Sequence, residues 1–148
     1  MRAAMLQVAT SILWPVLAHV AWVCLLYAWL TYARKVAVGR GEVDYSSFEF
    51  NRDEPPAVAR IRLNLANQFE LPVIFYALVV FLVALDRVTM FDVIAAWIFV
   101  AGRVIHTLVQ TLTDNVPLRG QVFMINFLAV VAIAIHMALV ALEGAGRP

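Results

Sequence analysis

The chain has 148 residues, of which 64% are hydrophobic and 14% are charged, and its formal net charge is +1. A soluble domain is usually about 45–50% apolar and about 25% charged, so the composition excludes an ordinary soluble domain and indicates an integral membrane protein. The balanced charge argues against a nucleic-acid partner, because the basic residues form no long patch. Cys24 is the single cysteine, which excludes an internal disulfide.

Four apolar segments reach the length of about 20 residues that a transmembrane helix needs. The sequence predicts helices over about 12–33, 57–85, 91–112 and 118–142, and a loop over about 34–56 that can carry a short helix. Spanning segments must satisfy their own backbone hydrogen bonds, and short connections favour antiparallel neighbours. We therefore expect one all-α integral membrane domain over residues 1–148, an up-down bundle of four transmembrane helices. The first segment is too long for a secretory signal peptide.

Basic residues concentrate on one side of the predicted bundle. This side holds Arg34, Lys35, Arg40, Arg52, Arg60, Arg62 and Arg119, whereas the other side holds Arg2, Arg87 and Arg147. Positive residues stay on the cytoplasmic side of a membrane. The charge pattern thus predicts that the loop over 34–56 is cytoplasmic and that both termini are not.

The second predicted helix begins with five polar side chains, namely Arg60, Arg62, Asn64, Asn67 and Glu70. An ionisable group inside a membrane costs roughly 3 kcal/mol or more unless it faces protein or water, so this cluster indicates a functional site. Four of the five recur at spacings of four and three, which places Arg60, Asn64, Asn67 and Glu70 on one helix face. Pro72 removes the backbone hydrogen bond to the carbonyl of Gln68 and predicts a kink here. The kink either shapes the site or reflects the ordinary tolerance of membrane helices for proline.

The third predicted helix carries a matching polar face, formed by Arg103, His106 and Gln110. Both faces lie on the order of 10 Å inside the membrane at a rise of 1.5 Å per residue, and Arg119 begins the fourth helix at the same side. These residues predict one cationic pocket in the cytoplasmic leaflet. Guanidinium groups bind carboxylates in a bidentate manner, so we expect an anionic, peptide-like ligand whose ammonium group pairs with Glu70.

Three other interpretations of the polar residues stay open. The pocket residues can simply hydrogen-bond one another and hold the helices together. His19 and His136 lie at similar predicted depth and can form a bis-histidine haem site. A transporter or channel is less consistent with the sequence, because polar residues in one leaflet give no continuous pathway. We expect no metal-ion site.

These residues, in this order, resemble the MAPEG family of membrane-associated proteins in eicosanoid and glutathione metabolism. NQFELPVIFY is similar to the family's Asn-x-x-Glu pair followed by proline, here Asn67, Glu70 and Pro72. GRVIHTLVQTLTDNVPLRG, over residues 102–120, keeps the spacing of the family's pocket arginine, histidine and second arginine, here Arg103, His106 and Arg119. The chain resembles bacterial-type members, near the branch with microsomal prostaglandin E synthase and microsomal glutathione transferase.

The resemblance implies a homotrimer in a bacterial inner membrane, with glutathione as co-substrate between the second helix of one subunit and the third and fourth helices of its neighbour. Arg119 would then be the catalytic residue, stabilising the glutathione thiolate for attack on a lipophilic electrophile or lipid hydroperoxide. The alternative is a non-catalytic, lipid-binding or scaffold trimer. The complete predicted binding set is Arg60, Asn64, Asn67, Glu70, Arg103, His106 and Gln110.

The chain departs from the family pattern at four pocket positions. Leu63 stands where family members commonly have an arginine, four residues before Asn67. Gly120, Phe123 and Gln110 stand where a serine and two tyrosines are found in the prostaglandin synthase branch. Without these hydroxyl groups, thiol activation would depend on Arg119 alone.

Overall fold

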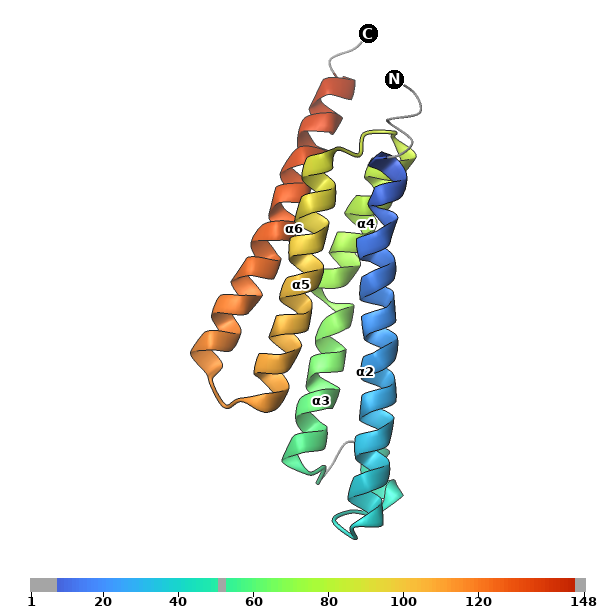
Figure 1. The fold of residues 1–148 in the computed structure, drawn as a ribbon, viewed down its shortest axis with the longest axis vertical. Coiled ribbons are helices and arrows are strands. Elements are labelled where there is room, and N and C mark those ends of the chain that lie inside the picture. The colour runs from blue at the N-terminus through green and yellow to red at the C-terminus, as the bar shows by residue number, and fades with distance from the viewer. Residues whose placement is uncertain (1–7, 51–52, 146–148) are drawn as a thin grey trace.

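The computed structural model describes residues 8–50 and 53–145 of the chain (Figure 1). The elements are α2 (Leu13–Gly39), η1 (Tyr45–Phe48), α3 (Pro56–Ala66), η2 (Asn67–Phe69), α4 (Leu71–Ala84), α5 (Met90–Leu112) and α6 (Val116–Ala145). The described residues contain no strand. Arg2, Arg52 and Arg147, which entered the charge argument, lie outside these residues.

Four helical stretches are long and apolar enough to cross a membrane, over Val8–Gly39, Pro56–Ala84, Met90–Leu112 and Val116–Ala145. This confirms the predicted all-α membrane protein with four spanning helices. The third helix follows the expected bounds closely, and the fourth extends beyond them at both ends.

The first helix continues beyond the expected end at Ala33 to Gly39, so the basic residues Arg34 and Lys35 are helical rather than part of the loop. Its end is fixed by local geometry instead of by the onset of charge. Gly41 has a φ of +70°, and the amides of Gly41 and Glu42 bond to the carbonyls of Val38 and Ala37. This is a Schellman motif, in which glycine accepts the left-handed conformation without steric cost.

The second helix is broken, whereas the sequence predicted one helix over 57–85. A short 3₁₀ turn, η2, separates α3 from α4, and Glu70 has φ −101° and ψ −97°. Pro72 cannot donate a backbone hydrogen bond and restricts the residue before it, so the helical ladder is interrupted here. The proline therefore produces a break instead of the expected kink.

Helix α5 lies at the centre of the bundle and packs against α6, α2 and α3, while α4 packs against α6. Figure 1 shows α6 diverging from α3 toward the end that contains the α5–α6 connection. We call this the basic end, because Arg34, Arg60 and Arg119 belong to it. The start of α2 and the end of α6 lie at the opposite end, which we call the terminal end.

The interior has two apolar clusters with a polar layer between them. One cluster, around Phe75 and Phe99, joins α4, α5 and α6 toward the terminal end. The other, around Leu26 and Ile61, joins α2 to α3 toward the basic end. The buried polar residues between them are His19, Asn64, Gln68, Arg103 and Thr107. Because buried polar groups must be hydrogen-bonded, this layer fixes how the helices align.

Candidate functional site

Arg103 lies inside the bundle, with only 1% of the residue exposed. Its Nε donates to Oε1 of Gln68 at 3.0 Å, and its Nη2 donates to the backbone carbonyl of Asn67 at 2.8 Å. That carbonyl belongs to the 3₁₀ turn η2, so the guanidinium is bonded directly to the break. The sequence placed Arg103 in a ligand pocket, but here it holds the break in the second helix.

Asn64 is fully buried and links α3 to α5. Its Nδ2 donates to Oγ1 of Thr107 at 3.1 Å, and the same hydroxyl accepts from Nε1 of Trp22 at 3.3 Å. The Thr107 hydroxyl in turn donates to the carbonyl of Arg103 at 3.0 Å. Asn64 is therefore part of the polar layer.

His19 completes the polar layer from α2. Its Nδ1 lies 2.5 Å from the Tyr76 hydroxyl and its Nε2 lies 3.2 Å from Oε1 of Gln68. Both ring nitrogens are therefore occupied by protein groups. His136 pairs with Asp92 at 2.8 Å, and Asp92 also forms the capping box of α5 with Thr89. These contacts favour helix packing over the haem interpretation.

A cavity of about 390 Å³ opens beside α5 at the basic end. We call it the Arg119 cavity; it is lined by Leu63, Asn67, His106, Gln110, Val116, Arg119, Gly120 and Phe123. A second hollow of about 210 Å³ shares four of these residues, Leu63, Gln110, Val116 and Arg119, and extends to Arg60 and Asp114. The two spaces thus meet along α5, between α3 and the start of α6.

Polar groups in the Arg119 cavity come from three elements. The Asn67 amide donates to Oε1 of Gln110 at 3.1 Å, which joins η2 to α5. His106 is 3% exposed, and its Nδ1 has no hydrogen-bond partner in the described part of the chain. Arg119 is exposed and forms no ion pair with any residue in ranges 8–50 and 53–145. The cavity therefore presents an unpaired cation and a free imidazole nitrogen.

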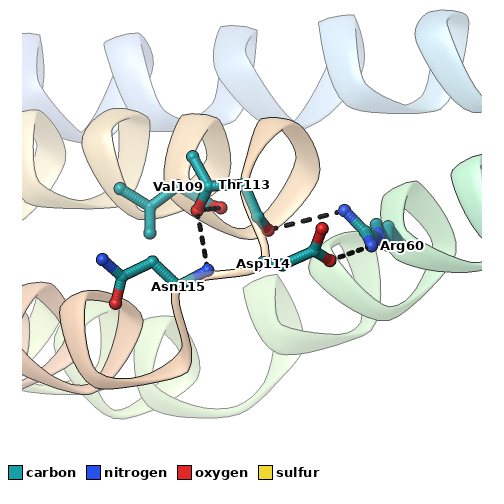
Figure 2. A network of polar contacts seen from close by, with 5 residues as sticks. All are labelled: Arg60, Val109, Thr113, Asp114 and Asn115. Carbon is teal, nitrogen blue, oxygen red and sulfur yellow. Dashed lines mark hydrogen bonds and ion pairs between the residues drawn. The ribbon is translucent and has the colours of Figure 1, made fainter.

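Arg60 closes the smaller hollow at its rim. Figure 2 shows its guanidinium reaching the α5–α6 connection, where Nη1 contacts the Thr113 carbonyl at 3.5 Å and Nη2 pairs with the Asp114 carboxylate. The connection is itself ordered, because the Asn115 amide donates to the Thr113 hydroxyl at 3.3 Å. Asp114 is thus the acidic group that accompanies Arg60 and Arg119 in this hollow.

Glu54 forms a separate ion-pair cluster at the basic end. Its side chain is 1% exposed and accepts from Arg34 Nη2 at 2.8 Å and from Arg62 Nε at 2.6 Å. Burial raises the pKa of Glu54, but the hydrogen bonds and charges of Arg62 and Arg34 outweigh it and hold the pKa below its ordinary value. Arg62, one of the five polar residues that open the second span, is therefore occupied outside the cavity.

The structure divides the predicted binding set into three groups. Asn67, His106 and Gln110 line the larger cavity together with Arg119, the predicted catalytic residue, and Arg60 lines the adjoining hollow. Asn64 and Arg103 face the interior, away from both spaces. The Glu70 side chain is exposed and makes no hydrogen bond or ion pair with the residues that the structure describes, while the Glu70 carbonyl accepts from the amide of Val73 at 3.2 Å. The two predicted polar faces thus contact each other, but only some of their residues line the cavity.

Gln68 and Thr107 are the site-supporting residues that the sequence reasoning missed. Gln68 is 1% exposed and contacts His19, Asn64 and Arg103. A signal was present, because Gln68 follows Asn64 by four positions and Thr107 follows Arg103 by four. Helical neighbours at that spacing share a face, so both residues extend the polar faces that were recognised.

Comparison with known families gives one finding that bears on this site. A sequence model of the MAPEG family matches residues 12–139, which is most of the 148-residue chain. The matched range includes every residue of the polar layer and of both cavities. No curated protein and no solved structure matches the chain.

Proposed function

Because this chain belongs to the MAPEG family, which includes glutathione transferases and peroxidases, we propose that it is a glutathione-dependent membrane enzyme. Its second substrate is a lipophilic electrophile or a lipid hydroperoxide that arrives from the bilayer. The reaction is conjugation of the electrophile to glutathione, or reduction of the hydroperoxide by it. The observation that carries the proposal is the Arg119 cavity.

The cavity suits a small peptide in size and in chemistry. Its volume of about 390 Å³ falls within the range of roughly 300–1,000 Å³ that is usual for small-molecule sites. The unpartnered Nδ1 of His106 is a buried polar atom that a peptide group can satisfy. Arg60 supplies a cation for a carboxylate of glutathione, and Arg119 supplies one for its thiolate.

Bound glutathione supplies the sulfur nucleophile, and the residues of the chain bind, orient and ionise it. Arg119 is the proposed catalytic residue: a guanidinium beside a thiol stabilises the thiolate and so lowers the thiol pKa. Asn67, His106 and Gln110 hold the peptide, with Asn67 and Gln110 already fixed to each other. None of the residues that line the cavity carries a hydroxyl group, so Arg119 activates the thiol without help from a serine or tyrosine.

The proposed enzyme is a homotrimer. Glu70 is exposed in the single chain, close to the break but outside both spaces. In the trimer, the break of one subunit faces the third and fourth helices of its neighbour, and Glu70 there meets the ammonium group of glutathione. The basic end faces the cytoplasm of a bacterium, because it holds Arg34, Arg60 and Arg119.

Calorimetric titration of the detergent-solubilised protein with glutathione tests binding, and conjugation to an aromatic halide or reduction of an organic hydroperoxide tests catalysis. We expect Arg119→Ala to lower kcat by about 100-fold, while glutathione affinity changes little. Arg40→Ala is the matched control, because Arg40 is an exposed arginine outside both spaces. Unchanged activity in Arg119→Ala would refute the role of this residue.

The alternative is a non-catalytic trimer that binds lipid or acts as a scaffold. The observation that supports this alternative is the absence of hydroxyl groups among the residues that line the Arg119 cavity. Glutathione binding together with no turnover of either substrate class would support it. Weaker glutathione binding by Glu70→Gln would identify the same site in either case.

A further inference from the structure

Asn67 belongs to both the polar layer and the cavity. Its backbone carbonyl accepts from Arg103 at 2.8 Å, whereas its side-chain amide lies in the Arg119 cavity and donates to Gln110 at 3.1 Å. Any shift of the break therefore moves a cavity-lining side chain. The position of Asn67 depends on whatever orients Arg103.

Gln68 is the residue that orients Arg103. Its Nε2 donates to the carbonyl of Asn64 at 3.0 Å, so its Oε1 is the atom that faces Arg103 and His19. The opposite orientation of the amide would place two donors against each other, since guanidinium nitrogens only donate. Both contacts of Oε1 are therefore accepted hydrogen bonds.

The orientation of Gln68 also determines which ring nitrogen of His19 carries the proton. The Nε2 of His19 must carry a proton to donate to Gln68, so Nδ1 of the neutral ring accepts from the Tyr76 hydroxyl at 2.5 Å. Each residue thus donates a hydrogen bond to the next, from Tyr76 on α4 to His19 on α2 and from His19 to Gln68. All three residues lie outside the two spaces at the basic end.

We propose that Gln68 and His19 are positioning residues of the glutathione site, which act through Arg103 to fix the helix break and thereby the side chain of Asn67. This proposal rests on the proposed function for its ligand, but the contacts that carry it are independent of glutathione. Neither residue touches the ligand. Their effect appears in binding and not in the chemical step, because Arg119 lies on α6 and, within the described residues, has no hydrogen bond or ion pair to the polar layer.

The test compares Gln68→Met with Gln68→Glu. Methionine keeps the length of the side chain but removes the acceptor for Arg103 and His19, whereas glutamate keeps this acceptor and loses only the donor to the Asn64 carbonyl. We expect Gln68→Met to raise the Kd and KM for glutathione by about tenfold, with kcat at saturating glutathione unchanged within about twofold. Gln68→Glu should return the KM to within about threefold of the parent value.

His136→Leu is the matched control, since it removes a buried polar link between helices at the terminal end. Amide hydrogen exchange over residues 64–71, measured without glutathione, supplies a second readout. We expect faster exchange in Gln68→Met and in His19→Leu, and parent-like exchange in Gln68→Glu and His136→Leu. Unchanged exchange in Gln68→Met would overturn the positioning role.

Two further results separate this proposal from the proposed function. If the parent protein binds glutathione but Gln68→Met has the same KM, or loses kcat as strongly as affinity, the positioning role is wrong and the proposed function stands. If the parent protein binds no glutathione, the proposed function fails, and with it the assignment of these residues to a glutathione site.

Discussion

Replacement of Gly102 by alanine should destabilise the bundle through one contact between α5 and α6. An added Cβ at Gly102 would lie 2.1 Å from Oδ1 of Asn126 and 3.1 Å from its Cγ. Asn126 is fully buried, and neither its Oδ1 nor its Nδ2 has a hydrogen-bond partner among the described residues. The added Cβ therefore forces the whole side chain of Asn126 to move.

The magnitude follows from two opposing effects. Insertion of a methyl group into a packed interior costs about 1–3 kcal/mol, whereas alanine gains about 0.8–1.0 kcal/mol over glycine inside a helix. The single variant should therefore lose about 0–2 kcal/mol of unfolding free energy. In an Asn126→Ala background the clash disappears, so the same substitution should stabilise by about 1 kcal/mol.

Denaturant titration of the detergent-solubilised protein, in a double-mutant cycle, measures this change of sign. Gly120→Ala is the control, because a Cβ there meets no atom of the described residues within 4 Å. If Gly102→Ala has the same effect in both backgrounds, the contact with Asn126 is not its cause and the steric argument fails.

Three other substitutions test the basic end. Because the folded-state pKa of Glu54 is lowered, its ion pairs stabilise the protein above the ordinary carboxyl pKa of about 4.3, and this stability is lost as the pH falls. Glu54→Gln should thus melt at a lower temperature than the parent at pH 7, with the difference closing below about pH 4. Phe123→Tyr places a hydroxyl in the Arg119 cavity and should raise the rate of glutathione conjugation several-fold; an unchanged rate would show that the hydroxyl does not reach the sulfur. Asp114→Asn releases Arg60 from its ion pair and should tighten glutathione binding by about two- to five-fold, measured by calorimetry; weaker binding would mean that Asp114 itself contacts the ligand.

The sequence was sufficient for the four spans because hydrophobic length decides them. It also grouped Arg103, His106 and Gln110 on one helix face, of which His106 and Gln110 line the Arg119 cavity and Arg103 faces the interior. The two polar faces were also expected at the same depth in the membrane, and Asn67 and Gln110, from different spans, are hydrogen-bonded.

The sequence could not show which polar residues face a cavity and which face the interior. The expected stripe from Arg60 to Glu70 assumed an unbroken helix with 3.6 residues per turn, and the break at η2 ends that periodicity before Glu70. Arg103 illustrates a second limit: its carbonyl partner on Asn67 lies in the 3₁₀ turn at the break. Such a partner depends on tertiary structure, so the pattern of residue types does not reveal it.

The polar layer separates the interior into two apolar clusters that share no residue. Energetic effects of substitutions that are well apart and have no common partner add independently. Changes to side chains of the first cluster that do not touch the polar layer should therefore sum with changes around Leu26 and Ile61 without coupling. Phe99 is different, because its ring lies 5.5 Å from that of His19. Evolution can thus vary the apolar side chains near the termini that lie away from His19 and Tyr76, for instance to suit a different bilayer, without disturbing the geometry beside Arg119.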